Sequence, residues 1–344
     1  MRSKSLRWKG LKIAVVSGLL WLPLAGFGAE PAVAPRVVAS IKPLHSLVVS
    51  VMQGISEPAL LVPGGASPHD YNLRPSDART LEQAQVIFWT GPELENFLIK
   101  PLHNIKGQVR AVALLDAPGI MVLPLREGGA WERHRHPHRP PPAHGEPGHN
   151  HERDHLADHA AHGEPDRGHA ADRDAHIWLD PVNASAIVRQ MVATLSEVDP
   201  AHQADYARNG AALTERLEQM NQQLAAELAP VLDQPYIVFH DAYQYFERRY
   251  GLNGVGSVVL SPDQRPGARR VAEIQARIRE LKVRCVFSEP QFQPALVETV
   301  IEGSQARRGV LDPEGGAELP SGPEAYFQLL QKLSGSLRTC LSGS

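Results

Sequence analysis

Short apolar runs alternate with stretches of helical periodicity along most of the chain. In the first part, four runs predict strands: Val37–Ile41, Ala59–Val62, Val86–Trp89 and Arg110–Leu115. After the first run, apolar residues lie three or four positions apart, at Leu44, Leu47, Val48 and Val51. Buried strands that alternate with helices are typical of a parallel sheet covered by helices. The first part is therefore predicted to be an α/β unit.

The alternation resumes after residue 230. Strands are predicted at Tyr236–Phe239, Val255–Leu260, Arg284–Ser288 and Arg307–Leu311. The predicted helices are Asp241–Tyr250, Pro266–Leu281, Pro294–Glu302 and Pro323–Leu333. Strand–helix units on each side of the middle of the chain predict the fold class, which is α/β with two (β/α) lobes, each built on a parallel four-stranded sheet.

A long helix is predicted between the two lobes, over Ala201–Leu228. Its apolar residues form one stripe, made of Tyr206, Leu213, Leu217, Met220, Leu224 and Leu228. About 28 residues at ~1.5 Å each make a rod about 40 Å long. Because the stripe is single, we expect this helix to pack along the lobes and join them. The predicted domains are an N-terminal lobe at 36–199, the linking helix at 200–230 and a C-terminal lobe at 231–344.

A polar insertion at residues 131–173 interrupts the alternation and is predicted to be disordered. It contains almost no aliphatic residues, so it cannot bury enough apolar surface to offset the entropy of ordering it. Tracts this rich in histidine are typical of metal binding. Its histidines are candidates for weak, accessory metal binding: His134, His136, His138, His144, His149, His151, His155, His159, His162 and His169.

The N-terminus has the pattern of a secretory signal. Basic residues precede the apolar run Ile13–Leu24, and small residues follow as far as Ala29. We therefore expect residues 1–28 to be a signal peptide, cleaved near residue 28, and the mature protein to be exported. The apolar run is too short to span a membrane comfortably, and no cysteine lies near it to carry a lipid anchor.

Charge and cysteine content narrow the function further. The signal peptide carries five of the 35 Lys and Arg and none of the 38 Asp and Glu, so the mature chain has 30 basic residues and a net charge of −8. This balance argues against nucleic-acid binding, which needs clustered basic residues. In an exported chain the even pair Cys285 and Cys340 most simply forms a disulfide, worth about 4 kcal/mol by chain entropy. Free thiols and metal ligands are the alternatives.

Polar residues directly after predicted strands are candidates for a binding site, because ligands of open α/β sheets lie beyond the carboxyl ends of the strands. These candidates are His69, His240, Glu289 and Asp312, and His176 joins them where the insertion gives way to an apolar segment. Each alone has an ordinary explanation, such as a capping histidine or a turn aspartate. Together, three imidazoles and a carboxylate form a typical transition-metal shell. Their scattered positions do not by themselves prove that they converge.

Five segments carry a resemblance to a known family: Val38–His45, Gly64–Asp77, His176–Pro181, Val238–Tyr250 and Val286–Phe292. They resemble the zinc-specific solute-binding proteins of ABC transporters, the ZnuA type. The resemblance spans the mature chain in order and includes the histidine-rich insertion and both cysteines. It implies two lobes bridged by a rigid helix, with the transported Zn²⁺ held between them by the positions that match His69, His176 and His240.

The resemblance also implies the function. A protein of this kind captures zinc with high affinity in the periplasm and delivers it to a membrane permease driven by a cytoplasmic ATPase. It is not an enzyme, and we expect a monomer. The implied fourth ligand is Asp312, which matches a carboxylate that follows the last strand in related manganese receptors. Glu289 and a water are the alternatives, because Pro68 stands where some zinc members have a glutamate. His45 is interpreted as structural.

A nitrogen-rich shell suits zinc better than manganese, magnesium or calcium, which prefer oxygen. Imidazoles must be deprotonated to bind metal, so affinity is expected to fall as pH drops through about 6.5. The rival hypotheses are a receptor for manganese, iron or nickel, a secreted zinc hydrolase, and a soluble zinc buffer or chaperone. Against the hydrolase, no glutamate base is paired with a histidine on a short motif.

Overall fold

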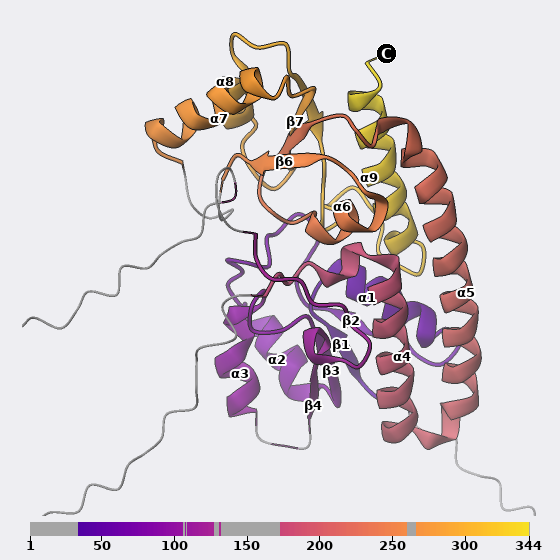
Figure 1. Ribbon diagram of the computed structural model, residues 1–344. Coiled ribbons are helices and arrows are strands. Elements are labelled where there is room, and N and C mark those ends of the chain that lie inside the picture. Colours follow the sequence, from indigo (N-terminus) through magenta and orange to yellow (C-terminus); the bar gives the residue numbers. More distant parts are fainter. Residues whose placement is uncertain are drawn as a thin grey trace, which may run out of the picture. The chain divides into compact units, whose positions relative to one another are not determined.

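Each strand-rich region forms a parallel four-stranded sheet in the structure, a computed structural model (Figure 1). The N-terminal sheet has the order β2-β1-β3-β4 and consists of Ala59–Leu60, Val37–Ala39, Val86–Trp89 and Arg110–Ala113. The C-terminal sheet has the order β6-β5-β7-β8 and consists of Gly254–Ser257, Tyr236–Val238, Cys285–Ser288 and Arg307–Val310. In both sheets the winding reverses between the first and third strands, where α/β folds bind ligands. The predicted fold class is confirmed.

The structure describes residues 34–105, 107, 109–126, 131, 173–259 and 266–343. The predicted signal peptide at 1–28 and the ten histidines from His134 to His169 lie outside these residues, and so does nearly all of the insertion predicted at 131–173. What the sequence predicts for those segments stays a prediction. In the part of the chain that is described, no helix has the length and apolarity that a membrane span requires.

Nine α-helices are described around the two sheets. They are α1 Lys42–Val51, α2 Pro75–Gln83, α3 Ile99–Asn104, α4 Pro181–Val198, α5 Gln203–Leu228, α6 Gln244–Tyr250, α7 Ala268–Glu280, α8 Ala295–Ile301 and α9 Ala325–Leu341. Helix α4 begins after Asp180, whose side chain accepts a hydrogen bond from the Val182 backbone and caps the helix. Helix α9 runs eight residues past its predicted end at Leu333, because its buried apolar face continues through Leu337 to Leu341.

The long helix α5 has 26 residues and lies beside α4 and α9 in Figure 1. All six residues of the predicted stripe are buried, together with Gly210. A Cβ atom at Gly210 would lie 2.4 Å from Cγ2 of Val192 on α4. Only glycine therefore allows α4 and α5 to approach this closely. The burial confirms that one face of the long helix packs along its neighbours.

One hydrophobic core cluster extends through both lobes, and each lobe has a smaller cluster of its own. A single cluster of buried residues includes strands of both sheets, helix α1 and the apolar face of α5. Every residue of α1 is buried, because α4, α5 and α9 all pack against it. Helix α9 belongs to the C-terminal part of the chain yet contacts α1 of the N-terminal part. The domain boundaries at residues 199 and 230 therefore stay a prediction.

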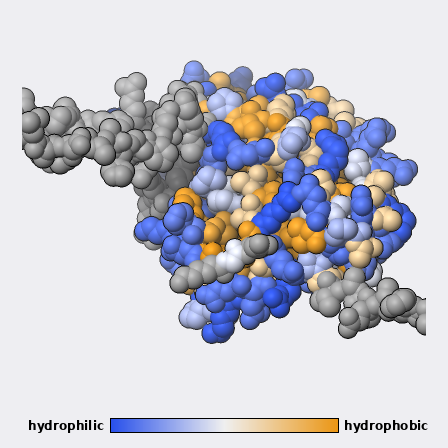
Figure 2. Space-filling model, turned by 90° about the horizontal axis from the view of Figure 1, so that it is seen from below, coloured by the Kyte–Doolittle hydropathy of each residue, from blue (hydrophilic) through white to orange (hydrophobic). Residues whose placement is uncertain are grey.

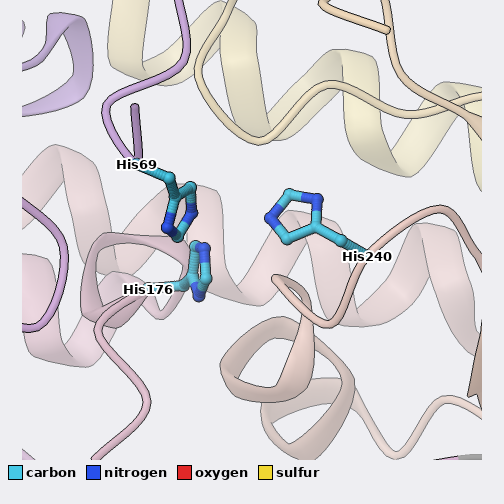
Figure 3. Close-up of side chains that lie close together, drawn as sticks. All are labelled: His69, His176 and His240. Atoms are coloured by element: carbon cyan, nitrogen blue, oxygen red, sulfur yellow. The ribbon is translucent and has the colours of Figure 1, made fainter. Parts of the chain in front are cut away.

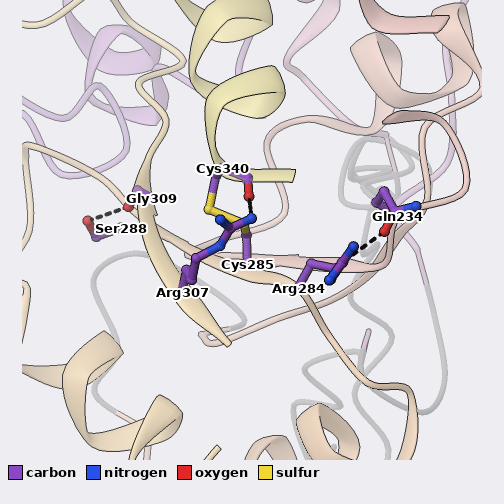
Figure 4. The surroundings of a disulfide bond; sticks show 7 residues. All are labelled: Gln234, Arg284, Cys285, Ser288, Arg307, Gly309 and Cys340. Atoms are coloured by element: carbon purple, nitrogen blue, oxygen red, sulfur yellow. Dashed lines mark hydrogen bonds between the residues drawn. A yellow bond between two sulfur atoms is a disulfide. The ribbon is translucent and has the colours of Figure 1, made fainter. Parts of the chain in front are cut away.

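The two cysteines form the predicted disulfide, which joins β7 to the last turn of α9 (Figure 4). The Cys285–Cys340 pair is buried, and the Arg307 guanidinium donates a hydrogen bond to the Cys340 carbonyl. Gly309 lies beside the bond, where a Cβ atom would come within 2.4 Å of the Phe287 ring and 3.4 Å of the Cys340 sulfur. A glycine is thus required on β8 where the disulfide joins α9 to the sheet.

Hydrophilic and hydrophobic side chains are mixed on the face of the molecule that Figure 2 shows. Among the described residues, the large hydrophobic side chains that are exposed lie on separate elements: Ile99, Leu125, Val182 and Val310. Exposed apolar side chains that are scattered singly are ordinary on a soluble surface. The surface therefore gives no independent indication of a partner.

Candidate metal-binding site

The three predicted histidines converge on one point (Figure 3). The ring centroids of His69 and His176 are 5.5 Å apart, those of His69 and His240 5.6 Å, and those of His176 and His240 5.4 Å. One nitrogen from each ring lies within 4.8 Å of the others. Nitrogens that each lie about 2.0–2.1 Å from one zinc ion would be separated by roughly 3–4 Å, so the observed spacing is close to that of a metal site.

Three separate segments supply these histidines. His69 lies in the loop between β2 and α2, where Gly65 adopts a φ of +91° that favours glycine. His176 precedes the short 3₁₀ helix Ile177–Leu179, which leads into α4. His240 follows β5 by two residues, at the point where the winding of the C-terminal sheet reverses. The fold, rather than local spacing, brings the three rings together.

Asp174 fixes the orientation of His176. Its Oδ1 lies 2.8 Å from Nδ1 of His176 and accepts a hydrogen bond from the His176 backbone N–H at 3.0 Å. With Nδ1 donating to this carboxylate, Nε2 keeps its lone pair for a metal. That Nε2 is buried and has no hydrogen-bond partner among the described residues. Burial, with a smaller effect from His240, lowers the pKa of His176 to about 3, so the ring is neutral and ready to bind a cation.

Glu289 holds His240 in the same way. Its Oε1 lies 2.7 Å from Nδ1 of His240, and Nε2 of His240 is buried with no partner in the described part of the chain. Burial alone would lower the pKa of His240, but the charge of Glu289 and its hydrogen bond outweigh burial, and the pKa is raised. Glu289 thus contacts the nitrogen that does not point at the other histidines.

Asp312 lies outside the histidine group. Among the described residues, the only cluster of potential ligand atoms is formed by the three histidines. The Asp312 Oδ1 atom instead accepts hydrogen bonds from the Gln291 side chain at 2.8 Å and from the Glu314 and Gly315 backbones at 3.0 Å. Asp312 therefore shapes the loop after β8 in this structure, and its role as fourth ligand stays a prediction.

Sequence reasoning missed two groups that support the site. The sequence carries a local signal for Asp174, an aspartate two residues before a candidate ligand, because such a carboxylate often accepts a hydrogen bond from the backbone two positions on. The second group is Arg126. It forms ion pairs with Asp241 and with Glu247, and so holds the segment after β4 against the residue next to His240. No short-range pattern in the sequence points to Arg126.

His45 lies apart from the three histidines and contacts a loop carbonyl. Its Nε2 lies 3.0 Å from the Pro58 carbonyl oxygen, and the side chain is buried in α1. Burial lowers the pKa of His45. A neutral imidazole that satisfies a loop carbonyl accounts for this residue without a metal.

A cavity of about 740 Å³ lies beside the site. Its walls include Ser67 and Asp70, which flank His69, and Phe239, which precedes His240. Phe292 stacks on Phe239 with the ring centroids 4.8 Å apart and lies edge-on to His240 at 6.4 Å. The histidine group is therefore bordered by aromatic rings on the side where this cavity reaches it.

Comparison with known proteins gives an independent result. Residues 37–340 match the family model of ZnuA, described as zinc-uptake complex component A, periplasmic. The high-affinity zinc uptake system protein ZnuA of Brucella suis is 48% identical over 93% of this chain and 96% of its own length. The protein of the same name from Yersinia pestis is 35% identical over 89% of this chain and 91% of its own length.

Solved structures share the fold. A crystal structure of ZnuA, 22% identical, aligns with a TM-score of 0.67 over 88% of this chain and 99% of that one. The periplasmic zinc-binding protein TroA from Treponema pallidum, 20% identical, aligns with a TM-score of 0.70 over 90% and 99%. The likeness to these structures concerns the two-lobed architecture and its long helix. The family model matches residues 37–340, and relatives named ZnuA align with nearly the whole chain. The protein therefore belongs to the ZnuA family.

Proposed function

We propose that this protein captures Zn²⁺ with high affinity in the periplasm and delivers it to the membrane permease of an ABC importer with a cytoplasmic ATPase. The observation that carries the proposal is the convergence of three imidazoles, two of which are held by carboxylates on the nitrogen away from the common point. Relatives that match nearly all of this chain are named for high-affinity zinc uptake. Zinc is the cargo of the protein and not a structural metal.

The donor set supports zinc. Three imidazole nitrogens suit zinc or another late transition metal, whereas manganese, magnesium and calcium prefer shells rich in oxygen. The fourth ligand is proposed to be Asp312, with Glu289 or a water as alternatives. In the structure the Oδ1 atom of Asp312 accepts hydrogen bonds from the Glu314 and Gly315 backbones, so Asp312 would bind the metal through Oδ2 or after exchanging these bonds. Glu289 would have to leave His240, which makes it the weaker alternative.

A receptor fits the site better than a zinc hydrolase. A hydrolase needs a carboxylate base beside the metal-bound water. Within the described residues, Asp174 and Glu289 both contact an Nδ1 atom and act as orienting groups. We propose further that the mature chain begins near residue 28, acts as a monomer and binds additional metal weakly through the histidines between His134 and His169.

Zinc titration by calorimetry tests the proposal. Purified protein that has been stripped of metal is expected to bind one Zn²⁺ tightly, and competing Mn²⁺, Fe²⁺ or Ni²⁺ should not displace it at equal concentration. Cells that lack the protein should lose zinc uptake at low external zinc, which separates a transporter component from a soluble buffer. Tighter binding of manganese or nickel, or hydrolase activity of the zinc-loaded protein, would contradict the assignment.

A further inference from the structure

Lys42 is a buried cation that reaches from one lobe to the other. It is the first residue of α1 and is 6% exposed. Its ammonium donates hydrogen bonds to the carbonyls of Gly315 at 3.3 Å, Gly316 and Leu319 at 2.7 Å, all in the loop after β8. An ammonium has three donors, and all three are used on this one loop of the opposite lobe.

The position of Lys42 is not explained by the stability of its own helix. The first turn of a helix carries partial positive charge, so a lysine there is on the unfavourable end. Burial also lowers the pKa of Lys42, against the charges of Asp312 and Glu314, which raise it. A polar N-cap side chain that accepts a hydrogen bond from the first turn would stabilise this helix more than the lysine does. The contacts that compensate for the buried charge all lie across the lobe boundary.

The loop that receives Lys42 is shaped for this contact. Gly315 and Gly316 have φ angles of +79° and +41°, which favour glycine and turn their carbonyls toward the ammonium. Asp312 holds the same loop from the other side through its bond to the Gly315 backbone. The indole of Trp178, two residues after His176, donates to the Pro313 carbonyl at 2.8 Å. The loop is thus tied to the segment that carries one of the histidines.

The loop that carries His69 packs against Lys42 and the 315–319 loop. A Cβ atom at Gly64 would lie 2.2 Å from the Gly316 carbonyl oxygen and 2.4 Å from the Lys42 ammonium. A Cβ atom at Gly65 would lie 3.4 Å from Cβ of Ala317. The start of the His69 loop is therefore pressed against the lysine and the loop it holds, four to five residues before the metal ligand.

We infer that Lys42 is a positioning residue for zinc binding: by holding the 315–319 loop against Gly64, it sets where His69 stands relative to His240 on the other lobe. This inference rests on the proposed zinc site. Asp174 and Glu289 orient His176 and His240 through their rings, whereas Lys42 acts on His69 through the backbone of its loop. A lysine that only stabilised the fold would leave the affinity of the folded protein for zinc unchanged.

The test compares Lys42→Met with Lys100→Met, which replaces an exposed lysine of α3. Lys42→Met is expected to weaken zinc binding by about 10- to 100-fold, the range for groups that position metal ligands. Cobalt bound to this variant should show a shifted visible spectrum. Wild-type affinity and spectrum in a folded Lys42→Met protein would overturn the inference, as would the same loss in Lys100→Met.

Gly64→Ala provides a second variant that keeps the ammonium but pushes the two loops apart, with Gly335→Ala as its control, because a Cβ atom at Gly335 meets nothing within 4 Å. Weaker zinc binding in Gly64→Ala alone supports the inference, and wild-type affinity contradicts it. This variant keeps the test decisive if Lys42→Met does not fold.

Chemical rescue adds a readout that a structural role would not give. In K42C the other two cysteines are joined as a disulfide, so the new thiol can be alkylated selectively in denaturant without reductant. Bromoethylamine restores a lysine-like ammonium, and iodoacetamide adds an uncharged group of similar size. Zinc affinity should recover with the first reagent only; recovery with both, or with neither, would overturn the inference. Absence of zinc binding in the wild-type control would instead refute the proposed function.

Discussion

Two histidine–carboxylate pairs in the site look alike and differ in their charge behaviour. In both, a buried carboxylate lies 2.7–2.8 Å from the Nδ1 atom of a buried histidine. Burial lowers the pKa of His176 to about 3, whereas the pKa of His240 is raised, because the charge of Glu289 and its hydrogen bond outweigh burial. The same hydrogen bond therefore yields one imidazole that stays neutral and one that is more basic than usual.

The carboxylates account for part of the difference. Burial raises the pKa of Asp174 to about 7, so its charged form is disfavoured. Asp174 therefore does little to stabilise a proton on His176. Asp174 is also local, two residues from its histidine, while Glu289 directly follows the neighbouring strand β7 and is separated from His240 by 49 positions. The comparison suggests that Asp174 chiefly sets ring orientation, and that Glu289 adds charge.

Removal of either ring should have the largest effect. We expect His176→Ala and His240→Ala each to abolish tight zinc binding, a loss of about a hundredfold or more, since a site worth about 10–16 kcal/mol shares its energy among about four ligands. Calorimetry with His103→Ala, an exposed histidine of α3, as the control measures this loss. Tight binding that survives in His240→Ala would rule out the proposed site and make the comparison of the two pairs irrelevant.

Neutralising the two carboxylates should separate their roles. Glu289→Gln and Asp174→Asn both keep an oxygen that can accept the Nδ1 hydrogen, so orientation is largely preserved. Glu289→Gln also removes the charge that raises the pKa of His240. We expect losses in zinc affinity of about 10- to 100-fold for Glu289→Gln and toward the lower end of that range for Asp174→Asn. Zinc affinity is measured by competition with a chromophoric chelator. Equal losses of affinity in the two variants would show that the charge of Glu289 contributes no more to zinc binding than that of Asp174.

The sequence predicted the fold and the three histidines for different reasons. Apolar periodicity was sufficient for the sheets and for the stripe on α5, because burial imposes a repeat of two or 3.6 residues. Periodicity could not predict Gly210, since the need for a bare backbone arises only where α4 meets α5. His69 and His240 could be proposed from their places after strands, but their convergence depends on how two lobes pack, which is a long-range property. Lys42 escaped notice for the same reason.

A smaller loss of zinc affinity is expected from a change at Asp312. Among the described residues, this carboxylate forms no hydrogen bond to a histidine. If it completes the metal shell, Asp312→Asn should weaken zinc binding by about tenfold, less than the loss of a histidine ring, because the amide oxygen can still bind the metal but carries no charge. Glu314→Gln, which neutralises a buried carboxylate two residues on, is the control. Unchanged affinity in Asp312→Asn would argue against Asp312 as the fourth ligand and leave Glu289 or a water for that position.

Deletion of residues 134–170 should have the smallest effect on tight binding. Among the described residues, the hydrogen bonds that orient the two histidine–carboxylate pairs are made by Asp174, His176, His240 and Glu289. The composition of the tract predicts weak sites, because a chain must lose conformational freedom to form each one. Calorimetry of the deletion variant should therefore show one tight zinc site of unchanged affinity and none of the weak ones. Loss of the tight site would mean that the tract supplies a ligand to the main site, and that the pairs at His176 and His240 are insufficient on their own.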